Sequence, residues 1–533
     1  MCNVRRPVED NWKQALPVLA VCRQWRRIGV PLVGRHSYIV YGDRSVLVRN
    51  PEAAAAAAAA SVRARTNLGL LAATGAYRQV RTELRLRAFY AGEPFDALEA
   101  MLAAARQARG RWDNVTSLNI NLSPQPRQPH SAQTADEHRA RRVAIVAQFG
   151  AVFPAVAELS IDGPYRNEHT APLYVALARL YSGQLRALST LPLVPASTMR
   201  FTAALTSLEI GAASGPAHRL PRVLAESLEE LALYCIPTDY AWTAHDGDCP
   251  GRVTFGRLRR LWAFYGSWRA VPAEAGAPKA QPPPVLAFPA LQTLHCTSDE
   301  GPAPLLGTAR LPAAMRRVVV RGPLETLQCA LAARLPGADG LTVSLAHSGR
   351  CSMDAVAATV NAIFRGARAD TRCELLLDER NIEFRPQDIV CPGLARLRVA
   401  APITAAAALA AVRRFPRLES LALTDVVPHP LPAEIPAATT TTSVAGADDN
   451  ALLASGASRP TVPPLAPRLE ALCLQYQPQL HPPEDMLAVA QYLLLCAPAL
   501  RRTMLRNMPG HLFAPLFERC QADYPHLGRI QMF

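Results

Sequence analysis

One short pattern returns along most of the chain and constrains its fold more than any other feature. An apolar residue is followed by two variable residues, a second apolar residue, one variable residue and a third apolar residue. Because side chains two residues apart lie on the same side of a strand, each copy predicts a short strand with one buried face. Clear copies are VTSLNI ending at Ile120, VAELSI at Ile161, LTSLEI at Ile210, LEELAL at Leu233, LRRLWA at Ala263, LQTLHC at Cys296, MRRVVV at Val320, GLTV at Val343, CELLL at Leu377, LARLRV at Val399, LESLAL at Leu423 and LEALCL at Leu474, with weaker copies near Leu188 and Leu505.

The spacing of the copies and the segments between them predict the architecture. Several neighbouring copies have central residues 22 to 24 positions apart, such as Leu208 and Leu231. Helical patterns fill some of the intervals, at 324–335, at 353–367 with Ser352 placed to cap the helix, and at 404–415. A short strand followed by a return helix predicts an α/β solenoid, a curved parallel sheet with helices on its convex side. Chance matches in a chain rich in Leu and Ala are the alternative, and the number of copies that end in a turn signal argues against it.

These repeats resemble the leucine-rich-repeat superfamily, in its irregular form, over residues 80–510. The Asn or Cys that usually follows the strand in that superfamily is mostly absent here. Three stretches rich in Pro, Ala, Thr and Ser, at 123–135, 271–289 and 427–468, lack a periodic apolar face, and we expect the third to be a disordered insertion. Residues 43–79, which include eight consecutive alanines, are interpreted as a linker or capping region, and 511–533 as a C-terminal cap.

The N-terminal residues 1–42 form a separate segment with a pattern of its own. Apolar residues recur near helical spacing up to Trp25, Pro31 ends the segment, and an alternating run from Ser37 to Tyr41 predicts a strand. The sequence Val21-Cys22-x-x-Trp25-Arg26 and the later Pro31-Leu32 resemble the second half of an F-box. The segment is most similar to fungal F-box-like proteins in which irregular leucine-rich repeats follow.

The F-box resemblance implies contact with a Skp-type adaptor protein. Residues 1–15 do not contain the Leu-Pro-x-Glu helix with which an F-box normally opens, so either translation starts further upstream or the domain is degenerate. Core packing in a terminal cap, which a repeat array requires, is the alternative role for Cys22 and Trp25. The residues expected to bind the adaptor are Leu16, Pro17, Leu19, Val21, Cys22, Trp25 and Leu32.

Composition excludes several classes of protein. With 533 residues, 50% of them hydrophobic and 19% charged, the chain can bury a large core. The net charge of +14 invites a nucleic-acid interpretation, but Lys13 and Lys279 are the only lysines, so a codon bias toward arginine explains the excess as well. No block of five or six like charges occurs, and nucleic-acid binding is therefore disfavoured. Scattered cysteines without a C-x-x-C motif, and no apolar stretch of membrane-spanning length, predict a cytoplasmic or nuclear protein outside the membrane.

Sequence motifs for catalysis are also missing. The phosphate-loop, dinucleotide-binding, zinc-protease and nucleophile-elbow patterns do not occur, and no two histidines lie four residues apart on a predicted helix. We therefore expect no enzyme, no cofactor and no metal site.

Strand alternation predicts where a target would bind. In LEELAL, Leu231 and Leu233 point into the core, so Ala232 and Tyr234 lie on the opposite, concave side. The same phase places Asn119, Glu209, Trp262, His295, Arg321 and Arg398 there. Aromatic side chains on such a face are typical interface anchors, although the Pro-rich stretch 271–289 could instead cover them as a lid. The predicted target-binding residues are Tyr234, Trp262, Phe264, His295, Arg321 and Arg398.

Together these features predict a protein-interaction scaffold. The resemblance implies the substrate-recognition subunit of a cullin-RING ubiquitin ligase of the F-box type, with an unknown protein target. A leucine-rich-repeat scaffold without ligase function, in which the F-box remnant serves as a cap, is the first alternative. An arginine-rich nucleic-acid-binding protein is the second.

Overall fold

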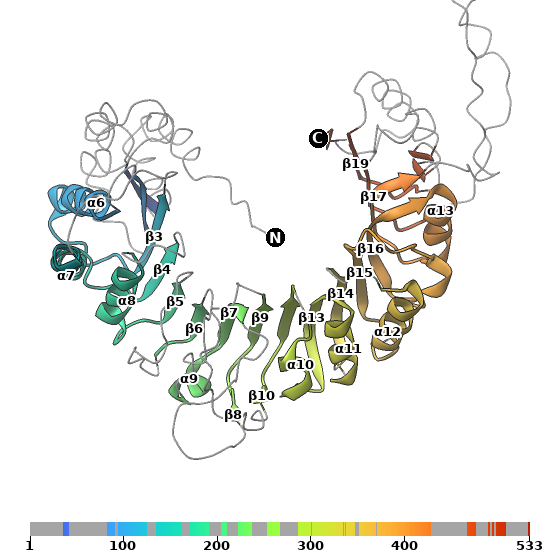
Figure 1. The fold of residues 1–533 in the computed structure, drawn as a ribbon, viewed down its shortest axis with the longest axis horizontal. Helices are drawn as coiled ribbons and strands as arrows, with labels where there is room; N and C mark the ends of the chain where they lie inside the picture. Colours follow the sequence, from blue (N-terminus) through green and yellow to red (C-terminus); the bar gives the residue numbers. More distant parts are fainter. Residues whose placement is uncertain are drawn as a thin grey trace, which may run out of the picture. The chain divides into compact units, whose positions relative to one another are not determined.

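The computed structural model divides the chain into two compact units, residues 1–290 and 291–533. Each unit is an α/β structure with a parallel sheet (Figure 1). The residues that the structure describes are 36–41, 83–90, 94–124, 135–162, 170–190, 204–210, 222–236, 253–266, 286–299, 301–333, 335, 337–346, 351–368, 370–427, 466–475, 489–490, 493–494, 497–507 and 531–532.

The sheet of the first unit is built from strands that pair in chain order, all parallel. Its register places the central leucines of the motif in one row across the sheet, from Leu84 through Leu118, Leu159, Leu188, Leu208 and Leu231 to Leu261. The motif therefore sets the register as well as the strand. The strands are β1 His36–Tyr41, β2 Glu83–Tyr90, β3 Ser117–Pro124, β4 Glu158–Asp162, β5 Ala187–Thr190, β6 Ser207–Ile210, β7 Glu230–Ile236 and β9 Arg260–Tyr265.

Helices of the first unit lie on one side of its sheet (Figure 1). The helix α6 (Pro94–Arg109) packs against β2 and against α7 (Ala135–Val152), which in turn packs against α8 (Thr170–Tyr181). The fully buried Trp112 donates a hydrogen bond from its indole nitrogen to the carbonyl of Ala105, 3.0 Å away. This bond ties the end of α6 to the loop that leads into β3. The short helix α9 spans Arg222–Ser227.

The end of the Pro-rich stretch 271–289 is part of the core, contrary to the sequence interpretation. The strand β10 (Leu286–Ala287) pairs with β8 (Val253–Thr254), and the Phe288 ring stacks on Phe255 with 5.3 Å between centroids. Three apolar residues in a row, 286–288, supply this contact after the Pro-rich part ends. The pattern was too short to be recognised as a strand.

The second unit repeats the same construction. Neighbouring strands are again parallel and follow chain order. They are β11 Thr293–Ser298, β13 Ala314–Gly322, β14 Gly337–Leu345, β15 Arg372–Leu377, β16 Leu394–Thr404, β17 Ser420–Val427, β18 Ala471–Gln475, β19 Arg502–Arg506 and β20 Gln531–Met532, and the two-residue β12 spans Ala309–Arg310.

Helices of the second unit also lie on one side, and those predicted from the sequence are confirmed (Figure 1). The helix α11 (Leu324–Ala332) packs against β13 and β14, and α13 (Ala405–Arg414) packs against β16. The side chain of Ser352 caps α12 (Met353–Arg365) as expected, and Thr404 caps α13 in the same way. The single-turn helices α10 (Pro304–Thr308) and η3 (Pro386–Asp388) fill other return segments.

In most copies of the motif, the first apolar residue lies before the strand and is buried. Examples are Val115, Leu205 and Leu228 in the first unit and Leu418 and Leu469 in the second, all at most 1% exposed. The backbone of this entry turn is bound to the preceding repeat: the amide of Glu229 donates to the carbonyl of Thr206, and that of Glu470 to Glu419, both at 2.8 Å. Each strand is therefore held in register before it begins.

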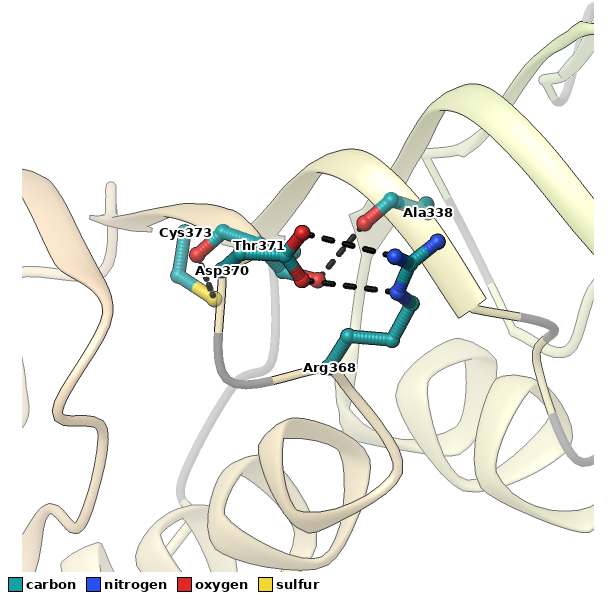
Figure 2. A network of polar contacts seen from close by, with 5 residues as sticks. All are labelled: Ala338, Arg368, Asp370, Thr371 and Cys373. Atoms are coloured by element: carbon teal, nitrogen blue, oxygen red, sulfur yellow. Dashed lines mark hydrogen bonds and ion pairs between the residues drawn. The ribbon is translucent and has the colours of Figure 1, made fainter.

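A polar network fixes the entry into β15 (Figure 2). The buried hydroxyl of Thr371 donates to the carbonyl of Ala338, 2.6 Å away, and the thiol of Cys373 lies 3.7 Å from the carbonyl oxygen of Thr371. The ion pair between Arg368 and Asp370 is exposed, so it adds little to stability. The buried hydroxyl is the contact that joins this loop to β14.

Every copy of the motif forms a strand, the two weaker copies included. Two details of the sequence interpretation are wrong. Leu341 pairs with Cys373 and not with the proposed centre Leu375, so the register differs there by two residues. The strand β2 was missed, although Leu84 and Leu86 alternate, because no apolar residue stands three positions before Leu84.

Several predictions concern residues outside the described ranges. They include the F-box-like helices, the alanine run at 53–60, and most of the 427–468 insertion. The strand predicted from Ser37 to Tyr41 is confirmed as β1, and β20 extends the parallel sheet to residue 532. Within the described part of the chain, no helix has the length and apolar character that crossing a membrane requires.

Candidate functional site

Each strand has two chemically different faces. In β9, Leu261, Ala263 and Tyr265 are buried on the side of the core, whereas Trp262 and Phe264 between them are partly exposed. We call the side opposite the core and helices the helix-distal face. The alternation predicted from the sequence is confirmed in β9 and in β16, where Leu397 and Val399 are buried and Arg398 is exposed.

The helix-distal face of the first unit carries an aromatic cluster, defined by Tyr234, Trp262 and Phe264. The rings of Tyr234 in β7 and Phe264 in β9 pack together with 6.3 Å between centroids and 39° between planes. Trp262 lies two residues before Phe264 on the same face of β9. All three side chains are partly exposed, so they present apolar area at the surface.

Polar and small residues continue the row of Trp262 across neighbouring strands. Trp262 pairs in register with Ala232, and Ala232 with Glu209. The carboxylate of Glu209 accepts a hydrogen bond of 2.8 Å from the hydroxyl of Ser189. A large ring and a fixed carboxylate two strands apart in one row can bind an apolar group and a hydrogen-bond donor of the same ligand.

The second unit carries a charged cluster on its own helix-distal face. Arg321 in β13 and Arg398 in β16 are exposed, and both reach the carboxylate of Asp378, which follows β15. The distances are 3.4 Å from Arg321 Nη2 and 3.3 Å from Arg398 Nε, and the Asp378 side chain is 15% exposed. We call this group of three the arginine clamp. Because it contains two cations and one anion, the arginine clamp carries a net positive charge.

His295 lies on the same face of β11, partly buried. Burial lowers the pKa of its imidazole, and the guanidinium groups of Arg317 and Arg321 lower this pKa further. His295 is therefore neutral at pH 7 and can act as a hydrogen-bond donor or acceptor there.

Two hydroxyl groups flank Arg321 in its row. Thr297 of β11 and Ser344 of β14 pair with Arg321 on either side, and each is 1% exposed. Neither hydroxyl has a hydrogen-bond partner within the described part of the chain. Nearby, the hydroxyl of Thr342 donates to the carboxylate of Glu374 over 3.0 Å.

The structure brings together some of the predicted target-binding residues and adds others. It joins Tyr234 with Phe264, and Arg321 with Arg398 through Asp378. Sequence reasoning missed Asp378, Arg317, Arg396 and Arg502. Applying the strand alternation to every copy, and to the residue after each strand, would have placed them on the helix-distal face.

The residues predicted to bind an adaptor, Leu16, Pro17, Leu19, Val21, Cys22, Trp25 and Leu32, lie outside the described residues. Among the residues that are described, no group of three or more His, Cys, Asp or Glu side chains could hold a metal ion. The described cysteines are free thiols: Cys296, Cys329, Cys351, Cys373, Cys391 and Cys473.

Comparison with known proteins gives no family for this chain. No model of a protein family matches it, and no curated protein sequence matches it either. The functional argument therefore depends on the geometry of the two helix-distal surfaces.

Proposed function

We propose that this protein is an interaction scaffold that holds a target protein on the helix-distal face of its sheets. The observation that carries the proposal is the contrast between the faces. The core positions of the strands are mostly Leu, Ile and Val, whereas their helix-distal positions include aromatic rings, arginines, carboxylates and hydroxyls. Partly exposed aromatic and arginine side chains are the usual anchors of protein interfaces.

The repeats are of the irregular leucine-rich kind in this proposal. Parallel strands in chain order, a buried apolar residue in each entry turn and return helices on one side support this assignment. Such arrays stack each unit on its neighbours, which leaves one long sheet face for binding.

We further propose that the scaffold is the substrate-recognition subunit of a cullin-RING ubiquitin ligase. The F-box-like sequence from Val21 to Leu32 supports this role, because it directly precedes β1. In this arrangement the N-terminal segment binds a Skp-type adaptor while the sheets hold the target. The chain supplies binding, and the covalent chemistry belongs to other subunits.

A scaffold without ligase function is the second candidate, and one observation favours it. The strand β1 pairs with β2, and within the first unit no described strand pairs with its other edge. The F-box-like segment leads directly into this edge strand. A repeat array needs a cap at such an edge, so the segment could serve the array itself.

Co-expression with a Skp-type adaptor distinguishes the two candidates. For the ligase subunit we expect capture of the adaptor by the full chain, and loss of that capture in Trp25→Ala with an unchanged circular dichroism spectrum. Trp262→Ala is the matched control, because it removes the same ring from the sheet and should leave adaptor capture intact. Absence of capture by the unmodified chain would contradict the ligase role, and loss of the fold in Trp25→Ala would support the cap.

A further inference from the structure

The arginine clamp has a counterpart in the second unit that lacks its carboxylate. In the clamp, one row runs across four neighbouring strands from Arg321 through Ser344 and Leu376 to Arg398. A second row runs across the next group of strands, β16 to β19 (Figure 1). It leads from Arg396 through Ser420 and Ala471 to Arg502. Both rows therefore have an arginine at each end and two uncharged residues between.

The carboxylate position differs between the two rows. In the clamp, Asp378 lies two residues beyond Leu376, directly after the third strand of the row, and binds both arginines. Two residues beyond Ala471, in the third strand of the second row, stands Cys473. A neutral thiol thus occupies the position that corresponds to the anion.

The electrostatic environment of Cys473 shows that cations surround it. Burial raises the pKa of this thiol, whereas the guanidinium groups of Arg506 and Arg398, from strands on either side, lower it. Cys473 is only partly buried. Positive charge therefore converges on an accessible position of the sheet face.

The terminal arginines of the second row make no ion pair. Within the described residues, Arg396 and Arg502 have no carboxylate partner, in contrast to Arg321 and Arg398. The acids beside these arginines have other partners: Glu374, which pairs in register with Arg396, accepts a hydrogen bond from Thr342, and Glu419 is engaged with Arg372 at 2.6 Å. We call Arg396, Arg398, Arg502 and Arg506, which surround Cys473, the arginine surface.

We propose that the arginine surface binds an acidic, extended segment of a partner protein, with a carboxylate placed next to Cys473 as Asp378 is placed in the clamp. This inference rests on the proposed scaffold function and names the chemistry of its partner. Arg396 and Arg502 are three strand spacings apart, about 14 Å, which an extended peptide covers with about four residues. Acidic residues at every fourth position would therefore meet both.

A protein segment fits this surface better than a nucleic acid does. The arginine surface includes the uncharged side chains of Ala422, Cys473 and Met504, all partly exposed. Two carboxylates, Asp378 of the clamp and Glu374 in register beside Arg396, would also repel a continuous phosphate backbone. Mixed charge and apolar area suits a peptide in which acidic and apolar residues are interspersed.

Fluorescence anisotropy of the full chain with a labelled 12-residue peptide tests the proposal. The peptide has Glu at every fourth position among Val and Ser. A control peptide has Gln in place of each Glu. We expect the Glu peptide to bind and the Gln peptide to bind at least about tenfold more weakly. Equal binding of the two peptides, or tighter binding of a single-stranded oligonucleotide than of the Glu peptide, would overturn it.

Arginine variants show where on the chain the Glu peptide binds. Arg396→Gln/Arg502→Gln should weaken binding of the Glu peptide by about tenfold or more. The control Arg365→Gln/Arg414→Gln removes the same charge from exposed positions at the ends of α12 and α13, and should change binding by less than about twofold. Equal losses in the two double variants would show that net charge alone attracts the peptide, and would overturn the proposal.

Cys473 supplies the most specific readout. Cys473→Asp places a carboxylate of the chain itself at the proposed position, so it should abolish peptide binding, whereas Cys473→Ser should not. Bound peptide should also protect Cys473 from N-ethylmaleimide and leave Cys351 reactive. If no variant affects peptide binding but the adaptor is captured normally, the scaffold proposal survives and this inference fails.

Discussion

The helix-distal surfaces of the two units differ in chemistry although the strands that carry them share one motif. In the first unit, Tyr234, Trp262 and Phe264 present aromatic area, and Glu209 lies two strands away in the row of Trp262. In the second, arginines dominate, and Asp378 holds two of them. The motif therefore fixes only the side chains on the core side of each strand. The positions between its apolar residues are free to vary, and they are where the units have acquired different binding chemistry.

The substitutions with the largest predicted loss of stability test whether the two units have equivalent cores. Leu261→Ala in the first unit and Leu397→Ala in the second remove completely buried side chains from equivalent core positions. Each should lower the free energy of unfolding by about 2–5 kcal/mol. Urea denaturation followed by circular dichroism measures this. A loss confined to one unit's variant would show that the cores are not equivalent.

A smaller effect compares the polar contacts that join neighbouring repeats. Thr371→Val removes a buried hydroxyl and leaves the carbonyl of Ala338 without it, which should cost about 1–3 kcal/mol. In the first unit, Gln184 donates to the carbonyls of Pro154 and Val156, both at 2.9 Å, but it is exposed. Gln184→Ala should therefore cost less in the same denaturation experiment, since water replaces its contacts. An equal or larger loss in Gln184→Ala would contradict this explanation.

Thermal unfolding of surface variants sharpens the contrast between the aromatic cluster and the arginine clamp. If the aromatic rings are interface anchors, Trp262→Ala should cost less than about 1 kcal/mol, as surface substitutions do. Arg398→Ala should have a similarly small effect, because it removes an exposed partner of Asp378. A loss of about 2 kcal/mol or more in Trp262→Ala would indicate a ring covered by its own chain, and would move the binding site elsewhere. In that case, target capture should not depend on Trp262.

A still smaller effect is the contribution of His295, in the second unit, to the pH dependence of stability. Because burial and the nearby arginines lower the pKa of His295, the unfolded chain binds a proton at this residue more readily than the folded chain does. Stability should therefore fall as the pH decreases through the ordinary histidine pKa of about 6.5. His295→Gln should reduce this fall when urea midpoints are compared at pH 7.5 and pH 5.5. An unchanged pH dependence in the variant would contradict the assignment.

Much of the fold could be predicted from the sequence, because the pattern that defines each strand lies within a few consecutive residues. Three apolar residues at fixed spacing define a strand, its buried face and its entry turn, so even the weak copies near Leu188 and Leu505 were recognisable. Helix caps such as Ser352 were recognisable for the same reason, since their bond partner is three residues away. Phe288 was not, because it belongs to a short apolar run whose burial depends on Phe255, in a distant part of the chain.

The candidate binding surfaces could likewise be predicted from the sequence only in part. The side chains of the helix-distal face follow from the sequence pattern, because alternation along a strand is a consequence of backbone geometry alone. The folded structure was needed to find that Arg321 and Arg398 share Asp378, and that Cys473 stands at the corresponding position between Arg398 and Arg506. Contacts between side chains of different strands depend on which strands become neighbours and on the register between them. The pairing of Leu341 with Cys373 instead of Leu375 is a register that the spacing of the motif did not predict.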